Sequence, residues 1–200
     1  MSGDDLGPWQ PATTGELVRL FSGAPFRWWV TGGVALELYA GRSWRDHADA
    51  DVGICRRDAP AAHRWLRRLH PYVAAAGRLR PWAGGPLSAA ADENNVWVKE
   101  RPDGPWRFDI AIGDGDPERW TYRRDPAIGR PWSGALMTTA DGVPYLAPEI
   151  QLLFKAKGPR PKDHVDAGVV IPLLDEWRRR WLAGHLPDGH PWLDQLGARR

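Results

Sequence analysis

The sequence predicts an α+β protein in which a small β-sheet is followed by C-terminal helices. Three observations support this class. In residues 28–54, an aromatic and β-branched segment meets a glycine pair, a short apolar helical pattern and an alternating acidic segment. Residues 96–100 and 106–112 alternate around the turn-forming sequence Arg-Pro-Asp-Gly-Pro, which is typical of a hairpin. From Pro148 onward, apolar residues recur at helical spacing.

The glycine pair Gly32-Gly33 stands between a strand expected over residues 26–31 and a helix expected over 34–40, which Gly41 would end. Without a Cβ atom, glycine lets a phosphate approach the backbone, where N–H groups at the start of a helix would face it. These residues are therefore candidates for binding a nucleotide. A tight turn is the alternative interpretation of the pair.

Residues 49–54 alternate between polar and apolar side chains, as a half-buried strand does. Ala50, Val52 and Ile54 would face the core, which places Asp49 and Asp51 together on the opposite face. Two neighbouring carboxylates repel each other unless a cation or solvent screens them. The pattern is compatible with a divalent metal site and equally with a solvated edge strand.

A third carboxylate comes from the second strand of the expected hairpin. Trp106, Phe108, Ile110 and Ile112 would face the core there, so Asp109 would lie on the open face. If this hairpin pairs beside the strand of residues 49–54, the three aspartates converge on one site. Two further aspartates, at positions 114 and 116, are weaker candidates because their glycine-rich surroundings indicate a loop.

The layout Gly32-Gly33 followed by Arg45-x-His47-x-Asp49-x-Asp51 resembles the nucleotidyltransferase superfamily with the DNA-polymerase-β-type core. Within it, the aminoglycoside and lincosamide nucleotidyltransferases are the most similar branch. The resemblance is clearest over residues 28–54 and continues more thinly to about Leu174. It implies a small mixed or antiparallel sheet with helices on one side, followed by C-terminal helices.

The resemblance also implies the chemistry of the site. Asp49, Asp51 and Asp109 would be the catalytic residues and would hold two Mg²⁺ ions, with Asp109 also a candidate general base. Arg45 would contact a phosphate or stiffen its loop. Lys155 would contact the triphosphate, although a lysine that complements a helix C-terminus is an equal alternative. Transfer of AMP from ATP, or of another nucleoside monophosphate, to a hydroxyl group is the implied reaction.

Two other sequence features are expected to support the site. His47, beside Arg45, would rigidify the loop through a hydrogen bond or salt bridge. The Lys-Asp-x-x-Asp sequence of residues 162–166 recurs in related nucleotidyltransferases and would close the nucleotide cleft through salt bridges, a structural role that we favour over direct catalysis.

Length and composition bound the remaining possibilities. We expect a catalytic core over residues 1–146 and a helical segment over residues 147–200 packed on it. The net charge of +2 does not indicate a surface that coats nucleic acid. The single cysteine excludes an intramolecular disulfide, and residues 1–11 form an expected irregular lead-in without signal-peptide character. With no apolar run long enough for a membrane span, these features favour the cytoplasm.

The acceptor stays open at this stage. A polycationic aminoglycoside would prefer an acidic cleft, whereas a lincosamide would prefer aromatic walls, which the thirteen tryptophans can supply. The acidic residues available for such a cleft are Asp92, Glu93, Asp103, Asp114 and Asp116.

Two alternatives to a small-molecule acceptor are weighed. A toxin-like nucleotidyltransferase that modifies tRNA or protein would need a continuous basic track, for which residues 56–57 and 64–68 offer arginines. A non-catalytic nucleotide-binding module would be expected to lose at least one of the three aspartates. Nucleic acid is thus the less favoured partner, and the sequence does not reveal an oligomeric state.

Overall fold

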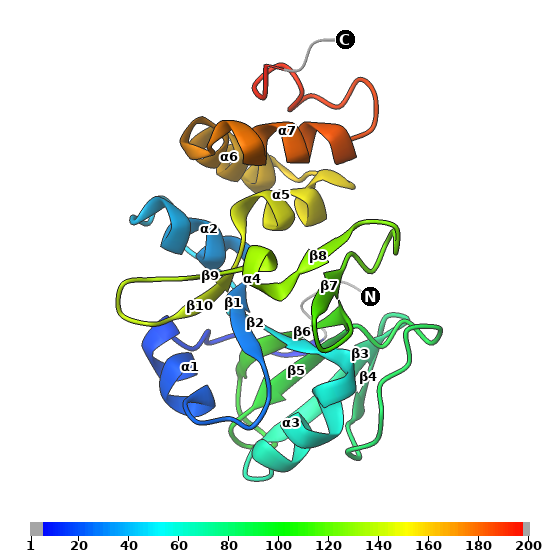
Figure 1. The fold of residues 1–200 in the computed structure, drawn as a ribbon. Coiled ribbons are helices and arrows are strands. Elements are labelled where there is room, and N and C mark those ends of the chain that lie inside the picture. Colours follow the sequence, from blue (N-terminus) through cyan, green and yellow to red (C-terminus); the bar gives the residue numbers. More distant parts are fainter. Residues whose placement is uncertain (1–5, 198–200) are drawn as a thin grey trace.

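The computed structural model describes residues 6–197. Over this range, ten strands form one branched sheet, shown in Figure 1, with the order β4-β3-β5-β6-β2-β1-β10-β9. Strand β7 pairs with β6 off this path, and β8 pairs with β7. The strands are β1 Trp28–Thr31, β2 Asp51–Cys55, β3 His70–Ala75, β4 Arg78–Pro81, β5 Asn95–Lys99, β6 Trp106–Gly115, β7 Arg119–Thr121, β8 Gly129–Pro131, β9 Leu136–Thr138 and β10 Pro144–Leu146.

The helices lie before, between and after these strands. They are α1 Thr14–Phe21, α2 Gly32–Ala40, α3 Ala59–Trp65, α4 Trp132–Ala135, α5 Pro148–Ala156, α6 Pro161–Val170 and α7 Glu176–His185, with the short 3-10 segments η2 Arg56–Asp58 and η3 Ile171–Leu173. Thr13 and Glu16 form the capping box expected at the start of α1. Gly41, in the left-handed conformation, ends α2 as expected.

The centre of the sheet confirms the fold class. Strand β2 pairs in parallel with β6 and antiparallel with β1, so the sheet is mixed. The hairpin of β5 and β6 therefore lies beside β2, as the sequence required, and its register places Asp51 opposite Asp109. Ala50 lies before the strand, where its carbonyl accepts a hydrogen bond from Asp109 N–H.

The face of the sheet opposite these aspartates carries a hydrophobic core against α1 and α3. Val52, Ile54 and Phe108 are buried there with Leu17 and Phe21 of α1. The alternation predicted for both strands is thus confirmed, and it leaves the aspartate face free for polar groups.

The C-terminal helices α5, α6 and α7 stack beyond α2 at one end of the sheet (Figure 1). Their apolar side chains, such as Ile150 and Leu182, belong to one cluster with Trp29 of β1 and Leu36 of α2. One hydrophobic core therefore includes residues on both sides of position 146, where the sequence suggested a boundary between the catalytic core and the helical segment. That division stays a prediction.

Some elements differ from the sequence analysis or were not predicted by it. Residues 72–87 contain most of the hairpin of β3 and β4, in which Ala76-Gly77 makes a tight two-residue turn with positive φ at both positions. Strand β2 begins at Asp51, so Asp49 precedes it. Helix α3 ends at Trp65. Residues 122–142 hold only the short elements β8, α4 and β9.

The N-terminal lead-in is tied to the sheet where it is described. Trp9 bridges to Trp106, and Gln10 N–H donates to the Trp106 carbonyl at 2.9 Å. Residues 1–5 of the expected irregular lead-in lie outside the described residues. Between residues 6 and 197, no helix is long and apolar enough to cross a membrane.

Candidate active site

A cavity of about 580 Å³ opens between the sheet and the C-terminal helices. We call it the main cavity. One wall comes from β1, β2 and β6, and the other from the segment that joins α5 to α6. Every site residue predicted from the sequence lines it, namely Gly32, Gly33, Arg45, Asp49, Asp51, Asp109 and Lys155.

Asp51 and Asp109 form the carboxylate pair of the main cavity. They are Cα partners in the parallel register of β2 and β6, so both side chains project from the same face. Asn95 on β5 donates its amide N–H to Asp109 Oδ2 at 2.5 Å. Asp109 Oδ1 is buried and has no hydrogen-bond partner among the described residues. The pair thus presents an unsatisfied oxygen in a buried position.

Burial and repulsion between neighbouring carboxylates raise the pKa values of both aspartates. Burial, followed by the charge of Asp49, raises the pKa of Asp51 to about 7, against a partial lowering by Lys155 and Lys162. Burial and the charge of Asp51 raise the pKa of Asp109 well above its usual value. Negative charge at this point is costly unless a cation enters.

The donor set fits Mg²⁺, which prefers carboxylate oxygens. The orphaned Asp109 Oδ1 and the raised pKa values of both aspartates are the features that a divalent ion would relieve. Within residues 6–197, however, no three acidic, histidine or cysteine side chains are gathered closely enough to hold a metal ion. Asp49 lines the main cavity from the loop before β2, and its role as a ligand stays a prediction.

Gly32 makes room for the Asp51 side chain. It has a φ of +71°, and a Cβ atom placed there would lie 1.9 Å from Asp51 Oδ2. Its N–H already donates to Gln151 Oε1 at 2.9 Å, and that oxygen also accepts from the Thr31 hydroxyl at 2.7 Å. Glycine is needed here for close packing of the carboxylate, and phosphate binding by Gly32 stays a prediction.

Gly33 makes room for Arg45 and His47. A Cβ atom on it would lie 2.2 Å from Arg45 Nη2 and 2.5 Å from His47 Cε1. His47 Nδ1 lies 3.1 Å from Arg45 Nη1, and His47 Nε2 lies 3.1 Å from the buried Glu37 carboxylate. His47 therefore has the stiffening role that the sequence suggested, and the absence of a side chain at Gly33 permits it.

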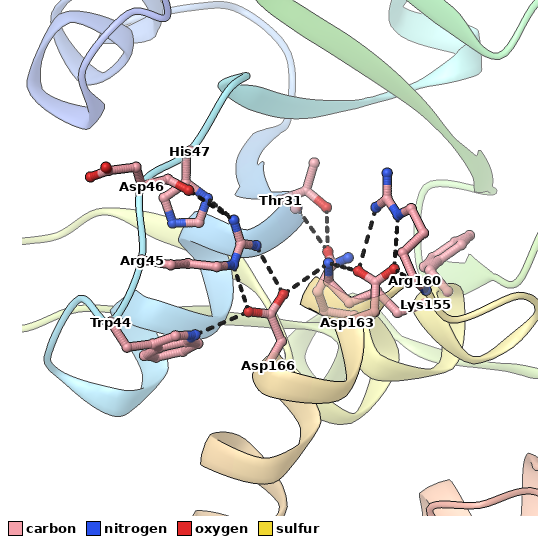
Figure 2. A network of polar contacts seen from close by, with 12 residues as sticks. Thr31, Trp44, Arg45, Asp46, His47, Lys155, Arg160, Asp163 and Asp166 are labelled. Carbon is pink, nitrogen blue, oxygen red and sulfur yellow. Dashed lines mark hydrogen bonds and ion pairs between the residues drawn. The ribbon is translucent and has the colours of Figure 1, made fainter.

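Arg45 and Lys155 meet in a salt-bridge network with two aspartates of α6 (Figure 2). Arg45 binds both carboxylate oxygens of Asp166, at 2.8 and 2.9 Å. Lys155 Nζ lies 2.7 Å from Asp163 Oδ1 and 3.1 Å from Asp166 Oδ2, and Arg160 donates to Asp163. The structural role proposed for the Lys-Asp-x-x-Asp sequence is thus confirmed for its two aspartates.

These two α6 carboxylates have lowered pKa values. Burial alone would raise the pKa of Asp163, but hydrogen bonds from Arg160 and Lys155 outweigh it and hold the pKa far below its usual value. Burial likewise opposes the hydrogen bond from Arg45 at Asp166, and the net pKa is lowered. Both aspartates are therefore fully ionised near neutral pH.

Cations dominate the wall that faces the carboxylate pair. Besides Arg45 and Lys155, the main cavity is lined by Arg123, Arg124, Lys157, Arg160 and Lys162. Three of the four lysines of the chain are thus at this cavity. Guanidinium and ammonium groups are the usual partners of phosphate oxygens, so the wall suits a polyphosphate.

The indole of Trp29 covers two glycines of the sheet on the side of the main cavity. A Cβ atom on Gly53 would lie 2.1 Å from the Trp29 ring, and one on Gly113 would lie 3.0 Å from it. Trp29 also packs against Trp132, with ring centroids 5.3 Å apart. The glycines of β2 and β6 therefore admit a tryptophan to the floor of the cavity.

Sequence reasoning missed three residues that organise the site. Asn95 holds Asp109, Gln151 holds Thr31 and Gly32, and Arg160 joins the salt-bridge network. Alternation along β5 could have placed Asn95 on the aspartate face. Nothing local identifies the partner of Gln151, which lies 119 positions from Gly32.

Comparison of the sequence with known families matches the part of the chain that includes the glycine pair. The sequence model of the aminoglycoside-2''-adenylyltransferase family matches residues 15–81, a segment that holds Gly32, Arg45 and Asp51. No curated protein matches the chain by sequence.

Solved structures extend the likeness over most of the chain. The lincomycin-bound lincosamide antibiotic adenylyltransferase LnuA aligns with a TM-score of 0.56 at 18% identity, covering 82% of this chain and 100% of that chain. ANT(2'')-Ia in complex with adenylyl-2''-tobramycin aligns with a TM-score of 0.55 at 12% identity, covering 86% and 93%. The resemblance drawn from the sequence is confirmed, and the fold is that of the nucleotidyltransferases.

Proposed function

Because the chain has the nucleotidyltransferase fold, we propose that it is a Mg²⁺-dependent adenylyltransferase that transfers AMP from ATP to a hydroxyl group of a small antibiotic. The observation that carries the proposal is the meeting of two groups in the main cavity. Asp51 and Asp109 lie on one wall and form no salt bridge with any residue that the structure describes, and arginines and lysines line the rest of the cavity.

The reaction is an in-line displacement at the α-phosphorus of ATP. The acceptor oxygen forms a bond to that phosphorus while the bond to the pyrophosphate oxygen breaks, so the products are the adenylylated acceptor and pyrophosphate. Asp109, held in place by the Asn95 amide, takes the hydroxyl proton as general base. Burial and the charge of Asp51 raise the pKa of Asp109, which makes its carboxylate a stronger base when it is ionised.

The cationic wall binds and orients the triphosphate. Arg123, Arg124, Lys157 and Lys162 all line the main cavity. Fixed positive groups stabilise the charge that develops on the leaving pyrophosphate without reorganising during the reaction. Arg45 and Lys155 hold the α6 aspartates and keep this wall in place beside the sheet.

The carboxylates would hold the metal. We assign Asp51 and Asp109 as ligands, with Asp49 as the third carboxylate and two Mg²⁺ ions in all. When bound, Mg²⁺ polarises the α-phosphate and neutralises the leaving group. The buried Asp109 Oδ1 without a partner supports this assignment.

The alternative functions find less support. A tRNA- or protein-modifying enzyme needs a continuous basic track, but Arg56 turns inward to Asp114 Oδ1 at 2.6 Å and to the Glu93 carbonyl at 2.9 Å. A non-catalytic module does not explain why Asp51 and Asp109 lie side by side, partly buried and without an ion-pair partner among residues 6–197. We therefore favour a small-molecule acceptor, a role in antibiotic resistance, and the cytoplasm as the place where ATP and the acceptor meet.

The proposal is tested by product formation. The purified chain is incubated with ATP, Mg²⁺ and either lincomycin or tobramycin, and pyrophosphate and the adenylylated product are measured. We expect a product from at least one acceptor, loss of it in Asp51→Asn, and full activity in Asp103→Asn. Asp103 lies in the exposed turn between β5 and β6, so its variant controls for the chemical change. No product with either acceptor in the wild type would overturn the proposal.

A further inference from the structure

A second cavity of about 760 Å³ lies against the hairpin of β3 and β4. We call it the hairpin cavity. It meets the main cavity at Asn94, Asn95, Asp109 and Arg123, which line both. If Asp109 accepts the proton of the acceptor hydroxyl, that hydroxyl must come within hydrogen-bond reach of it. The hairpin cavity offers this access away from most of the cationic wall.

Trp97 gives the hairpin cavity a rigid aromatic wall. It is the register partner of Asp109 in the pairing of β5 and β6. Its ring packs edge-on against Trp9 and Trp106, with ring centroids 5.1 and 5.5 Å apart. The remaining lining is largely apolar and small, and comprises Leu6, Ala74, Ala75, Ala76, Gly77 and Leu79. Such a surface binds an apolar ring or chain face.

The charges of the hairpin cavity balance. Arg78 and Arg123 line it together with Asp92 and Asp109, and the Asp92 carboxylate already accepts from the Asn94 amide at 2.5 Å. A polycation in this cavity would meet two guanidinium groups and no excess of carboxylates. Like charges brought together without compensation weaken binding.

The acidic cleft that a polycation requires is not assembled. Four of the five acidic residues that the sequence offered are used within the chain. The partners are Arg80 for Glu93, Arg56 for Asp114, Arg101 for Asp103, and the N–H groups of Glu118 and Arg119 for Asp116. Only Asp92 of the five lines the hairpin cavity, among the residues that the structure describes.

We propose that the acceptor is a hydroxyl compound with an apolar ring or chain face and at most one positive charge, bound in the hairpin cavity against Trp97 with its hydroxyl at Asp109. This inference rests on the proposed adenylyl transfer and names the class of its acceptor. It selects the less charged of the two antibiotic types that the sequence left open.

Acceptor binding tests the inference separately from turnover. Calorimetry measures the Kd of lincomycin, which has one basic amine, and of tobramycin, which has several, on the full chain with Mg²⁺ and a non-hydrolysable ATP analogue. We expect lincomycin to bind at least about tenfold more tightly. Trp97→Ala should weaken lincomycin about tenfold, and Trp97→Phe less, with the Kd of the analogue unchanged in both.

A charge-reversing substitution tests the effect of the cavity's charge on acceptor binding more directly. Arg78→Glu should tighten tobramycin binding by about fivefold or more, because it removes a repulsive guanidinium and adds a carboxylate. Arg68→Glu, an exposed arginine just beyond α3, makes the same charge change away from both cavities and should leave the Kd unchanged.

The outcomes separate the two proposals. Tighter binding of tobramycin than of lincomycin by the wild type, or an unchanged lincomycin Kd in a folded Trp97→Ala, would overturn the acceptor class. Either result would leave adenylyl transfer intact. Selective lincomycin binding without any adenylylated product would instead overturn the transfer and retain the binding site.

Discussion

Two pairs of aspartates face the same neighbourhood and differ in almost every physical respect. The pair on α6 is buried, and the pair on the sheet is partly buried. Asp163 and Asp166 of α6 are held by Arg45, Lys155 and Arg160, and their pKa values are lowered. Asp51 and Asp109 of the sheet have raised pKa values. Asp109 is held by one neutral amide, which leaves its second oxygen without a partner among the described residues.

The difference separates a structural role, for the α6 pair, from a catalytic role, for the sheet pair. Charges compensated inside the chain fix the position of a helix, and their removal leaves buried cations unpaired. Uncompensated carboxylates cost stability and persist where a ligand or metal supplies the missing charge. The α6 pair should therefore govern folding, and the sheet pair should govern turnover.

The largest expected effect is on catalysis. Asp109→Asn should lower kcat/KM by about 10³-fold or more, because it removes a metal ligand and the proton acceptor together. Its melting temperature should stay equal or rise, since a repulsive buried carboxyl is gone. Steady-state kinetics and calorimetric melting check both parts. A large loss of stability would show that Asp109 has a structural role, as the α6 pair does.

The complementary variant tests the other half of the comparison. Asp166→Asn should reduce the free energy of unfolding by about 3 kcal/mol, because Arg45 and Lys155 lose a buried ionised partner. Chemical denaturation measures this, with Asp46→Asn, an exposed aspartate of the same loop as Arg45, as the matched control. Equal stability of the two variants would contradict a structural role for the network.

The two pairs should also respond oppositely to pH. The pKa of Asp51 is about 7 in the folded chain, against an ordinary value of 3.8. The folded state thus binds more protons between these values, and stability falls as pH rises through the window. The pKa values of the α6 aspartates are lowered, so these residues contribute to folding stability above pH 4. They lose that contribution only as the pH falls further.

The measurement is unfolding at several pH values in EDTA. Wild type should lose stability from pH 4 to 7 relative to Asp51→Asn, whose curve should be flatter. Parallel curves for the two proteins would show that Asp51 is not held protonated by its surroundings.

A smaller effect is expected at Asn95. The hydrogen bond from Asn95 orients Asp109 and lowers the pKa of its carboxyl. Asn95→Ala removes this bond, so the pKa of Asp109 should rise. We expect kcat to fall about tenfold and the acidic limb of the kcat profile to move to higher pH. Restoration of the profile by Asn95→Gln would support a positioning role. A lower kcat with an unshifted profile would argue for a purely structural one.

The sheet half of the site could be predicted because its information is local. Period-two alternation placed Asp51 and Asp109 on the open faces of their strands, and the pairing of those strands, which the sequence left as a condition, is met in the structure. The network half could not be assembled in this way, because the Arg45–Asp166 pair joins residues 121 positions apart. The resemblance implied that Lys155 would contact the triphosphate and that the α6 aspartates would form salt bridges. Which cation met which carboxylate depended on how α6 packs.

The hairpin cavity shows a different limit. Its wall includes β3 and β4, which carry no strong strand signal: β3 ends in two alanines, and β4 is four residues long with two arginines and a proline. The acidic cleft considered from composition failed for a related reason. A count of carboxylates does not reveal that Glu93 and Asp114 are already paired with arginines.

Nucleotide binding tests the central contrast most directly. Thermal unfolding is followed with each NTP, with and without Mg²⁺, for wild type, Asp51→Asn and Asp103→Asn. We predict stabilisation by ATP that requires Mg²⁺, disappears in Asp51→Asn and persists in Asp103→Asn. Equal stabilisation of Asp51→Asn and wild type, or no shift with any NTP, would contradict the assignment of the sheet aspartates to a metal–nucleotide site.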